Sequence, residues 1–367
     1  METNISELER RVGTVESQLR ESRDILAMAI QTIQILVERL NMVERQFSKI
    51  HHGMPRHGGY DLVRFDTVSL FVPMHDNLYN SFLPAECKGF TIEQHYELMR
   101  TETPFADDAL RSDVTKLLYL YMDILFGAGI GVHLLDIGAW IGDVAIRLAK
   151  YAKLRGAKFH AECFDPSFAG TLIPFNIELN DVRDRVTFKP IGVSDCGGPQ
   201  IFNQVFGNSD GSQLLSGDGD GRISETYLVR TVTLADCLPE HAPDTHVMVK
   251  IDVEGIDAKL VAQARGQLAD ATLIIEFAPA QEQYRKIAAD QFLSDLQTSH
   301  TLFDIYYCPR PTRAAIVRDP QEFIEDVRHR PFGYTDVLAV PKSLGAHDDI
   351  VRQLSRLTPI EPSLMMA

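Results

Sequence analysis

The sequence lacks a surplus of basic residues. Its 36 lysines and arginines are outnumbered by 51 aspartates and glutamates, which gives a formal net charge of −15. Binding along nucleic acid requires a basic surface, so we expect no nucleic-acid partner. Cysteine is also scarce. The five cysteines have no metal-ligand spacing, so no metal site is assigned to them, and we expect reduced thiols in a cytoplasmic protein.

A membrane-targeting pattern is missing as well. The N-terminus contains acidic residues and no apolar h-region, which argues against a signal peptide. The most apolar stretch, residues 117–135, is interrupted by Gly127, Gly129 and Gly131. A helix, a turn and a buried strand explain this stretch better than a membrane span, and we expect no transmembrane segment.

Residues 5–47 contain no proline and a single glycine, Gly13. Apolar residues recur there at the a and d positions of six heptads, and Ser22 is the one polar exception. A period of 3.5 residues sustained over this length is typical of a coiled coil. We predict an oligomerisation helix over residues 1–50, pairing with itself or with a partner's helix. The alternative is a helix that packs on its own catalytic domain.

The rest of the chain divides into three predicted segments: a linker and cap over residues 51–112, a catalytic domain over 113–345, and a C-terminal helix and tail over 346–367. Helical segments alternate in the catalytic domain with seven short apolar strands, at residues 133–137, 158–164, 186–191, 246–251, 272–277, 302–307 and 335–340. This order predicts an α/β fold with a seven-stranded, mostly parallel, doubly wound Rossmann-like sheet. Ligands bind such sheets at the carboxyl ends of the strands.

The most informative motif follows the first of these strands, in residues 134–143. An apolar run ends at Asp136, passes through Gly138 and Gly142, and opens into an amphipathic segment. This pattern is typical of a buried strand that turns into a helix whose free N–H groups face a ligand. Dinucleotide-binding enzymes use a similar turn, so the motif alone leaves the ligand open.

Three further strands end in acidic residues. Asp165 ends the second strand, where a ribose diol would sit. The segment Lys250-Ile251-Asp252-Val253-Glu254-Gly255 ends the fourth, and Glu276 lies at the end of the fifth. Together with Asp136, this series indicates a methyltransferase that uses S-adenosyl-L-methionine (SAM). Paired acids also suit Mg²⁺, so metal dependence stays open.

Four blocks in this order resemble the FkbM family of SAM-dependent methyltransferases: Asp136-Ile137-Gly138-Ala139 with Gly142, Phe164-Asp165-Pro166 with Asn176, residues 250–255, and Ile275-Glu276. The resemblance covers roughly residues 110–342. It implies a seven-stranded methyltransferase fold and methylation of hydroxyls on sugars, glycans or secondary metabolites. Two residues depart from the family: Trp140 stands where Asn is frequent, and Asp165 stands where Glu is usual.

We expect the cofactor to contact Asp136, Gly138, Ala139, Trp140, Gly142, Asp165, Pro166, Val193 and Ser194. Asp136 would bind the methionine ammonium, and Asp165 both ribose hydroxyls. The two glycines would let the backbone approach the cofactor. Residues 191–195 would contact adenine, and the Trp140 ring either lies over the cofactor or packs in the turn. For both aspartates the alternative role is capping the next helix.

Catalysis is expected at the end of the fourth strand. A hydroxyl is a poor nucleophile until a base removes its proton. Asp252 is the first candidate for base or substrate anchor, Glu254 and Glu276 are alternatives, and Lys250 would orient one of the acids. Glu254 could instead cap the following helix. The sequence thus predicts an O-methyltransferase. A nicotinamide-dependent oxidoreductase leaves residues 250–255 unexplained, and the non-enzymatic alternative is a coiled-coil scaffold with a SAM-binding domain.

Overall fold

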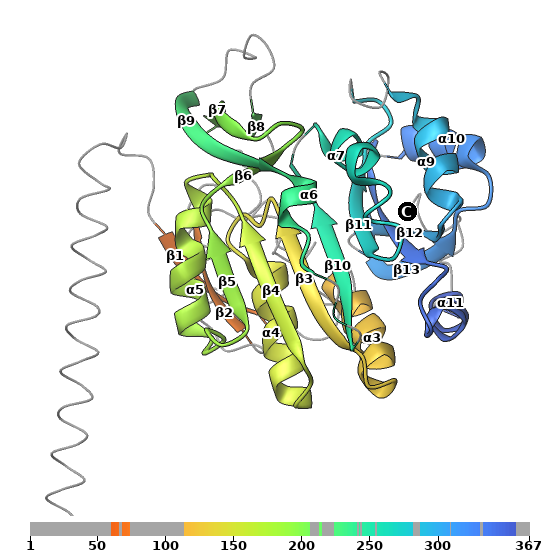
Figure 1. The fold of residues 1–367 in the computed structure, drawn as a ribbon, viewed down its shortest axis with the longest axis horizontal. Coiled ribbons are helices and arrows are strands. Elements are labelled where there is room, and N and C mark those ends of the chain that lie inside the picture. The colour runs from red at the N-terminus through yellow and green to blue at the C-terminus, as the bar shows by residue number, and fades with distance from the viewer. Residues whose placement is uncertain are drawn as a thin grey trace, which may run out of the picture. The chain divides into compact units, whose positions relative to one another are not determined.

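The computed structural model describes residues 60–65, 68–73, 114–205, 213–214, 224–240, 242, 244–253, 255–281, 287–308, 310–330 and 333–356. The chain divides into two compact units, residues 1–58 and 59–367, and every described residue belongs to the second unit (Figure 1). The predicted coiled coil and the C-terminal tail beyond residue 356 lie outside the described residues. Most of the predicted cap does too.

A central sheet of eight strands organises this unit, in the order β13-β12-β14-β11-β10-β3-β4-β5. Its strands are β3 (Gly131–Ile137), β4 (Phe159–Phe164), β5 (Val186–Lys189), β10 (Thr245–Ile251), β11 (Thr272–Phe277), β12 (His300–Cys308), β13 (Arg310–Ile316) and β14 (Thr335–Pro341). Strands β3, β4, β5, β10 and β11 are parallel, whereas β14 runs antiparallel to both of its neighbours. The mostly parallel α/β sheet is therefore confirmed.

The predicted count of seven strands is wrong by one, because β13 pairs antiparallel with β12 at the sheet edge. Its sequence, RPTRAAI, has two arginines and a proline instead of an apolar run. An edge strand has one neighbour only, so it tolerates charged residues and a proline that a central strand would exclude.

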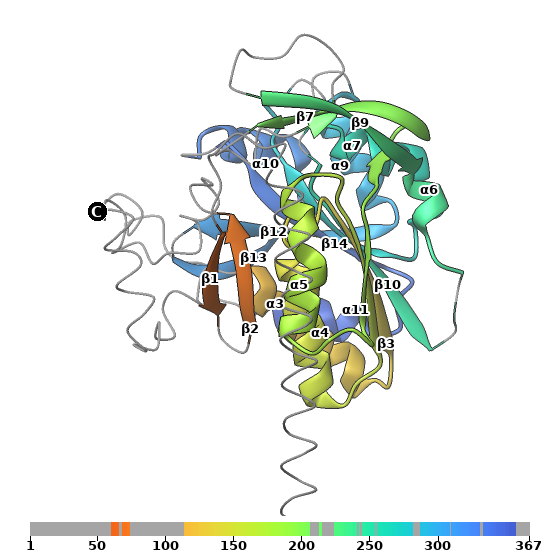
Figure 2. The ribbon, with the colours of Figure 1, turned by 90° about the vertical axis from the view of Figure 1, so that its left-hand side faces the viewer.

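Helices cover both faces of the sheet (Figures 1 and 2). One face packs against α3 (Val114–Gly127), α4 (Asp143–Arg155) and α5 (Ile173–Leu179). The other face forms a continuous apolar core with α7 (Asp257–Ala264), α9 (Ala289–Gln297) and α10 (Pro320–Arg328). The final helix, α11 (His347–Leu354), packs against α3. Within the described part of the chain, no helix combines the length and the apolar character that crossing a membrane requires.

A second sheet is inserted between β5 and β10. Its four strands are β6 (Gly192–Ser194), β7 (Gly198–Val205), β8 (Gln213–Leu214) and β9 (Ser224–Thr233), in the order β6-β9-β7-β8. Strands β7 and β9 pair antiparallel along the whole length of β7. A single short helix, α6 (Leu234–Cys237), then leads to β10, so no long helix of the described chain crosses the front of β4 and β5 in Figure 1.

A hairpin of β1 (Tyr60–Phe65) and β2 (Val68–Pro73) packs against α4, α5 and the short helix η4 (Ala169–Leu172). Asn176, which is fully buried on α5, fixes this contact. Its amide accepts from the backbone N–H of Phe71 at 2.6 Å and donates to the carbonyl oxygens of Phe71 and Ile141. Asn176 thus positions the hairpin against the loop after β3.

Candidate active site

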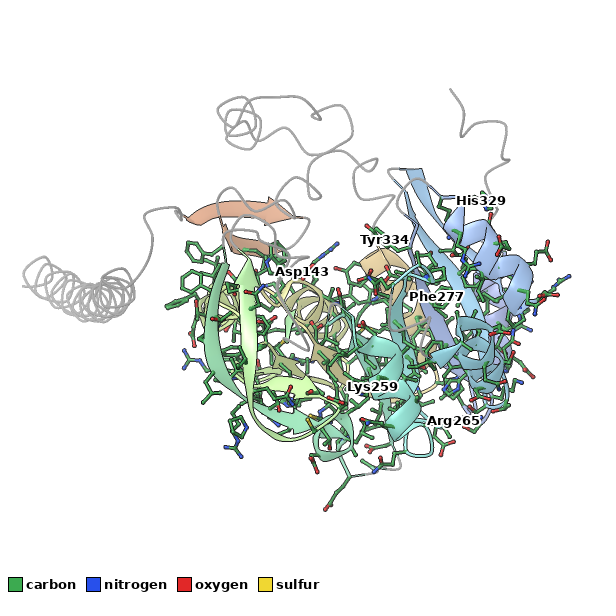
Figure 3. The ribbon with its side chains drawn as sticks, turned by 90° about the horizontal axis from the view of Figure 1, so that it is seen from above. Asp143, Lys259, Arg265, Phe277, His329 and Tyr334 are labelled. Carbon is green, nitrogen blue, oxygen red and sulfur yellow. The ribbon has the colours of Figure 1, made fainter. Side chains whose placement is uncertain are left out.

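Strand register gathers the predicted acids on one face of the sheet at its carboxyl edge. Lys250 on β10 is the register partner of Asp136 on β3 and of Ile274 on β11. Because side chains alternate along a strand, Glu276 shares the face of Lys250, and so does its partner Asp336 on β14. Asp252 follows β10 two residues after Lys250. We call Asp136, Lys250, Asp252, Glu276 and Asp336 the acid edge; Figure 3 looks down on this end of the sheet.

Lys250 is the cation that these acids face. Its Nζ donates to Asp252 Oδ2 at 2.9 Å and lies 3.9 Å from Asp136 Oδ1. Burial favours a neutral amine, but the charges of Asp252 and Asp136 raise the pKa of Lys250 above its usual value. The lysine is therefore charged and donates to the Asp252 carboxylate, while its role in orienting an acid for catalysis stays a prediction.

Asp136 is 1% exposed, and only one of its two carboxylate oxygens accepts a hydrogen bond from a described residue. Its Oδ2 accepts from the backbone N–H of Ala145 at 3.3 Å, in the first turn of α4. Among the described residues, Oδ1 has no hydrogen-bond donor. Burial raises the pKa of Asp136, and the charge of Lys250 partly opposes that rise. The helix contact thus uses Oδ2 alone, and Oδ1, with Lys250 Nζ at 3.9 Å, is the oxygen left for the ligand contact, which stays a prediction.

Negative charge exceeds positive charge at the acid edge. Burial and the nearby Asp252 carboxylate raise the pKa of Glu276 to about 9 and that of Asp336 to about 7. Sequence reasoning missed Asp336 because it stands at the start of a strand. The available signal was topological: a last strand that runs antiparallel begins at the edge where its parallel neighbours end. Such crowding favours a bound cation and supplies carboxyl groups that titrate near neutral pH.

The loop after β3 has left-handed backbone at three positions. Gly138 has φ 74°, and a Cβ there would lie 1.7 Å from the carbonyl oxygen of Asp252. Glycine is therefore needed first for close contact with the end of β10, and only then for the cofactor approach that we expected. Trp140 and Gly142 have φ 49° and 77°. For a tryptophan this conformation costs on the order of 1 kcal/mol, and such strain concentrates at functional sites.

Asp165 joins this loop to the end of β4. Its Oδ2 accepts from the Trp140 N–H and its Oδ1 from the Ser167 N–H, both at 2.7 Å. Burial raises the pKa of Asp165 to about 6, although these hydrogen bonds oppose the rise. Each carboxylate oxygen can accept a second hydrogen bond, so the predicted contact with a ribose diol remains available. The neighbouring Pro166 carbonyl accepts from the Tyr227 hydroxyl at 3.2 Å.

The remaining candidates lie away from the acid edge or outside the described residues. The predicted third strand ends early, at Lys189, so Val193 and Ser194 belong to β6 of the inserted sheet. Val193 packs in the apolar core, and Ser194 Oγ lies 3.0 Å from Asp195 Oδ1. Glu254 is not among the described residues. Asp257 stabilises the turn there, since its carboxylate accepts from the N–H groups of Val253 and Gly255.

Comparison with known proteins covers four of the five acid-edge residues, all except Asp336. Residues 136–298 match the family model described as "Methyltransferase FkbM domain". No curated protein sequence matches the chain significantly. This match confirms the resemblance to the FkbM family over the matched residues.

Three solved structures are similar in part. Methyltransferase FkbM from Methylobacillus flagellatus KT is 15% identical, with 51% of this chain and 44% of that protein covered and a TM-score of 0.34. An O-methyltransferase family protein from Burkholderia thailandensis is 14% identical, with 65% and 60% covered and a TM-score of 0.28. A putative class I SAM-dependent methyltransferase from Listeria monocytogenes is 9% identical, with 77% and 90% covered and a TM-score of 0.30. The chain spans less than half of the first protein's length.

Proposed function

Because residues 136–298 form an FkbM methyltransferase domain, we propose that the protein transfers a methyl group from SAM to a hydroxyl of a sugar, a glycan or a secondary metabolite. The observation that carries this proposal is the acid edge, of which Asp136, Lys250, Asp252 and Glu276 lie within the matched residues and Asp336 follows on β14. Four acidic side chains face one lysine there, on the face and at the end of the sheet where ligands of this fold class bind.

The charge of the edge suits the cofactor. SAM supplies an electrophilic methyl group on a sulfonium and has a net positive charge at neutral pH, so an acid-rich site favours it. Asp136 would accept from its ammonium through Oδ1, and Asp165 would accept from its ribose hydroxyls. The loop after β3, which contains Gly138, Ala139, Trp140 and Gly142, and the loop after β4, which contains Pro166, would contact the cofactor. Contacts of Val193 and Ser194 with adenine stay a prediction.

Asp252 is our candidate for the base. Its side chain is 39% exposed, so an acceptor can reach it, and Lys250 holds its carboxylate in place. With SAM bound, Asp252 would take the proton of the acceptor hydroxyl while the hydroxyl oxygen forms the new bond to the methyl carbon. The bond between that carbon and the sulfonium sulfur would break, and neutral S-adenosyl-homocysteine would leave. Glu276 is half-buried, and its raised pKa of about 9 keeps it protonated at neutral pH, so it suits a positioning role better. Glu254 stays an alternative base. Carboxylates are also the ligands that Mg²⁺ prefers, and assays with Mg²⁺ or with EDTA decide whether a metal takes part.

The decisive experiment has two stages. Isothermal titration of the full chain with SAM should show binding, whereas NAD should not bind. The protein is then incubated with methyl-labelled SAM and glycan or metabolite extracts. We expect incorporated label to resist mild alkali, as a methyl ether does. Absence of SAM binding would refute the function, and label released by alkali would place the methyl group on a carboxyl instead.

We also propose that a coiled coil over residues 5–47 holds the protein in a homo-oligomer in the cytoplasm. Leu26 occupies a heptad core position, so Leu26→Lys should lower the mass measured by light scattering, while the substitution Gln31→Lys, outside the heptad core, should not. Equal masses for wild type and both variants would reject the coiled-coil interface.

A further inference from the structure

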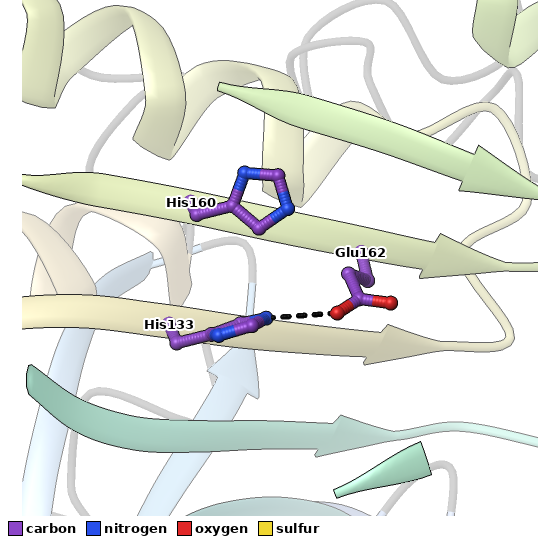
Figure 4. A group of neighbouring side chains, drawn as sticks. All are labelled: His133, His160 and Glu162. Carbon is purple, nitrogen blue, oxygen red and sulfur yellow. Dashed lines mark hydrogen bonds and ion pairs between the residues drawn. The ribbon is translucent and has the colours of Figure 1, made fainter. Parts of the chain in front are cut away.

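Two histidines and a glutamate lie together on the face of the sheet opposite to the acid edge. His133 on β3 and His160 on β4 are register partners, and Glu162 follows His160 by two residues on the same face. Figure 4 shows the Glu162 carboxylate at the end of the His133 ring, joined to it by a dashed line, with the His160 ring on the neighbouring strand. Neighbouring strands are about 4.8 Å apart, so the register alone brings these side chains within reach of each other. We call these three residues the histidine group.

The potential ligand atoms are near the spacing that a metal ion requires. His133 Nε2 lies 3.1 Å from Glu162 Oε1, and one ligand atom from each of the three residues lies within 4.8 Å of the others. Two ligands at about 2.1 Å from a tetrahedral Zn²⁺ are about 3.4 Å apart. The pair formed by His133 and Glu162 already meets this spacing, and His160 has roughly 1.4 Å to close, which a turn of its ring about the side-chain bonds can supply.

The protonation states also suit metal binding. The hydrogen bond from His133 holds the pKa of Glu162 at about 2 despite burial, so the carboxylate is charged. Burial lowers the pKa of His160, so its imidazole is neutral and a nitrogen lone pair is available. Lys189 forms an ion pair with the second oxygen of Glu162 and leaves Oε1 to His133. Carboxylates that bind metals are commonly held by such a second contact.

An ion can reach these residues from solvent. The side chains of His133 and Glu162 are 18% and 14% exposed. In the described chain, the connection between β5 and β10 contains the four-residue helix α6 instead of a long helix. A metal bound here would keep at least one water ligand.

From this geometry we infer that His133, His160 and Glu162 form a binding site for one divalent transition-metal ion, with Zn²⁺ as the best match to two imidazoles and a carboxylate. The ion replaces the proton that His133 Nε2 shares with Glu162, and that proton moves to Nδ1 or to solvent. The bound metal joins β3 to β4, the strands that end in Asp136 and Asp165. The site is separate from the methyl-transfer chemistry, and its test does not depend on that activity.

The full-length protein, dialysed against EDTA and then freed of chelator, is titrated with ZnCl₂ in competition with a chromophoric chelator. We expect one tight site per chain. At a zinc concentration 100 times the Kd, the melting temperature should rise by about 4 to 8 °C. Failure of wild type to bind zinc more tightly than an exposed histidine does would overturn the proposal.

Variants locate the site. Glu162→Gln and His133→Asn should each weaken zinc binding by at least about 100-fold, since even residues that only support metal ligands cost 10- to 100-fold. The matched control removes three histidines from one segment, His51→Ala, His52→Ala and His57→Ala, and should bind zinc as wild type does. Loss of the tight site in this control, with Glu162→Gln unaffected, would assign the metal elsewhere.

A measurement on wild type alone covers the case in which a variant fails to fold. Diethyl pyrocarbonate modifies accessible imidazoles, and peptide mass spectrometry reads the extent at each histidine. Zinc should protect His133 and His160 at least fivefold and leave the exposed His329 unchanged. Equal modification of His133 and His160 with and without zinc would exclude them as ligands.

Discussion

The acid edge and the histidine group lie on opposite faces of neighbouring strands, and they handle charge in opposite ways. At the acid edge, four carboxyl groups face Lys250, and the pKa values of Glu276 and Asp336 rise. In the histidine group, Glu162 has both His133 and Lys189 as partners, and its pKa falls to about 2. The first arrangement opposes folding when ionised and is stabilised by a cation from outside. In the second arrangement the charge of Glu162 is already paired within the protein, so a metal would replace a proton and would not supply a missing positive charge.

Asp252→Asn tests the acid edge where the expected effect is largest. Removing a general base costs about 10²- to 10⁴-fold in kcat, whereas the amide keeps the size of the side chain. The rate of labelled methyl transfer measures the loss. Asp244→Asn is the matched control, since Asp244 is an exposed acid that pairs with Lys158 before β10 and should leave the rate within twofold. A normal rate for Asp252→Asn would mean that Glu254 or solvent, and not Asp252, removes the proton.

Asp136→Asn should weaken SAM binding by about 10- to 100-fold, because a hydrogen bond between charged groups contributes about 1.5–3 kcal/mol. Titration calorimetry gives the Kd. Asp143→Asn removes a nearby charge on the first turn of α4 and should change the Kd less than threefold. Equal losses in the two variants would mean that net charge attracts the cofactor without a specific contact to Asp136.

Most of the sheet was predictable because its strands are short apolar runs bounded by turn residues. The segments expected at 246–251 and 272–277 differ from β10 and β11 by one residue at most. β13 was missed because an edge strand needs no apolar pattern. The third strand was predicted two residues too long because its apolar pattern continues to Ile191, and the residues that follow were therefore expected at the cofactor edge.

The acids of the parallel strands were predictable because each ends its strand, whereas Asp336 and the histidine group required the strand pairing. His133 and Glu162 are far apart in the sequence and show no ligand motif. Only the alignment of β3 with β4 places them on one face. A motif search detects functional residues that lie close together in the sequence, in one turn. It misses functional residues that the register of two paired strands brings together.

The two groups should respond to pH with opposite sign. The folded pKa of Asp336, about 7, exceeds its unfolded value near 3.8, so its stabilisation is complete below pH 3.8 and is lost as the pH rises through 7. Asp336→Asn should therefore raise the free energy of unfolding at pH 8 by about 2 kcal/mol and change it little at pH 4. The folded pKa of Glu162 is depressed, so its contribution is present above pH 4.5 and is lost as the pH falls toward 2.

Glu162→Gln should accordingly lower the free energy of unfolding at pH 8 by about 1–2 kcal/mol, measured in EDTA to exclude metal. Urea unfolding of the two variants at pH 4 and pH 8 gives both numbers. If both variants shift stability in the same direction at pH 8, the contrast between the two groups is wrong.

The smallest expected effect is a proton released on cofactor binding. Near pH 7, Asp336 is partly protonated, and a cation bound at the acid edge lowers its pKa. SAM binding should then release a fraction of a proton, which appears as a difference in binding enthalpy between phosphate and Tris buffers. The difference should shrink in Asp336→Asn and persist in Glu162→Gln, whose carboxylate is ionised before SAM binds. A buffer difference that both variants retain would show that another group titrates and that Asp336 does not respond to the cofactor's charge.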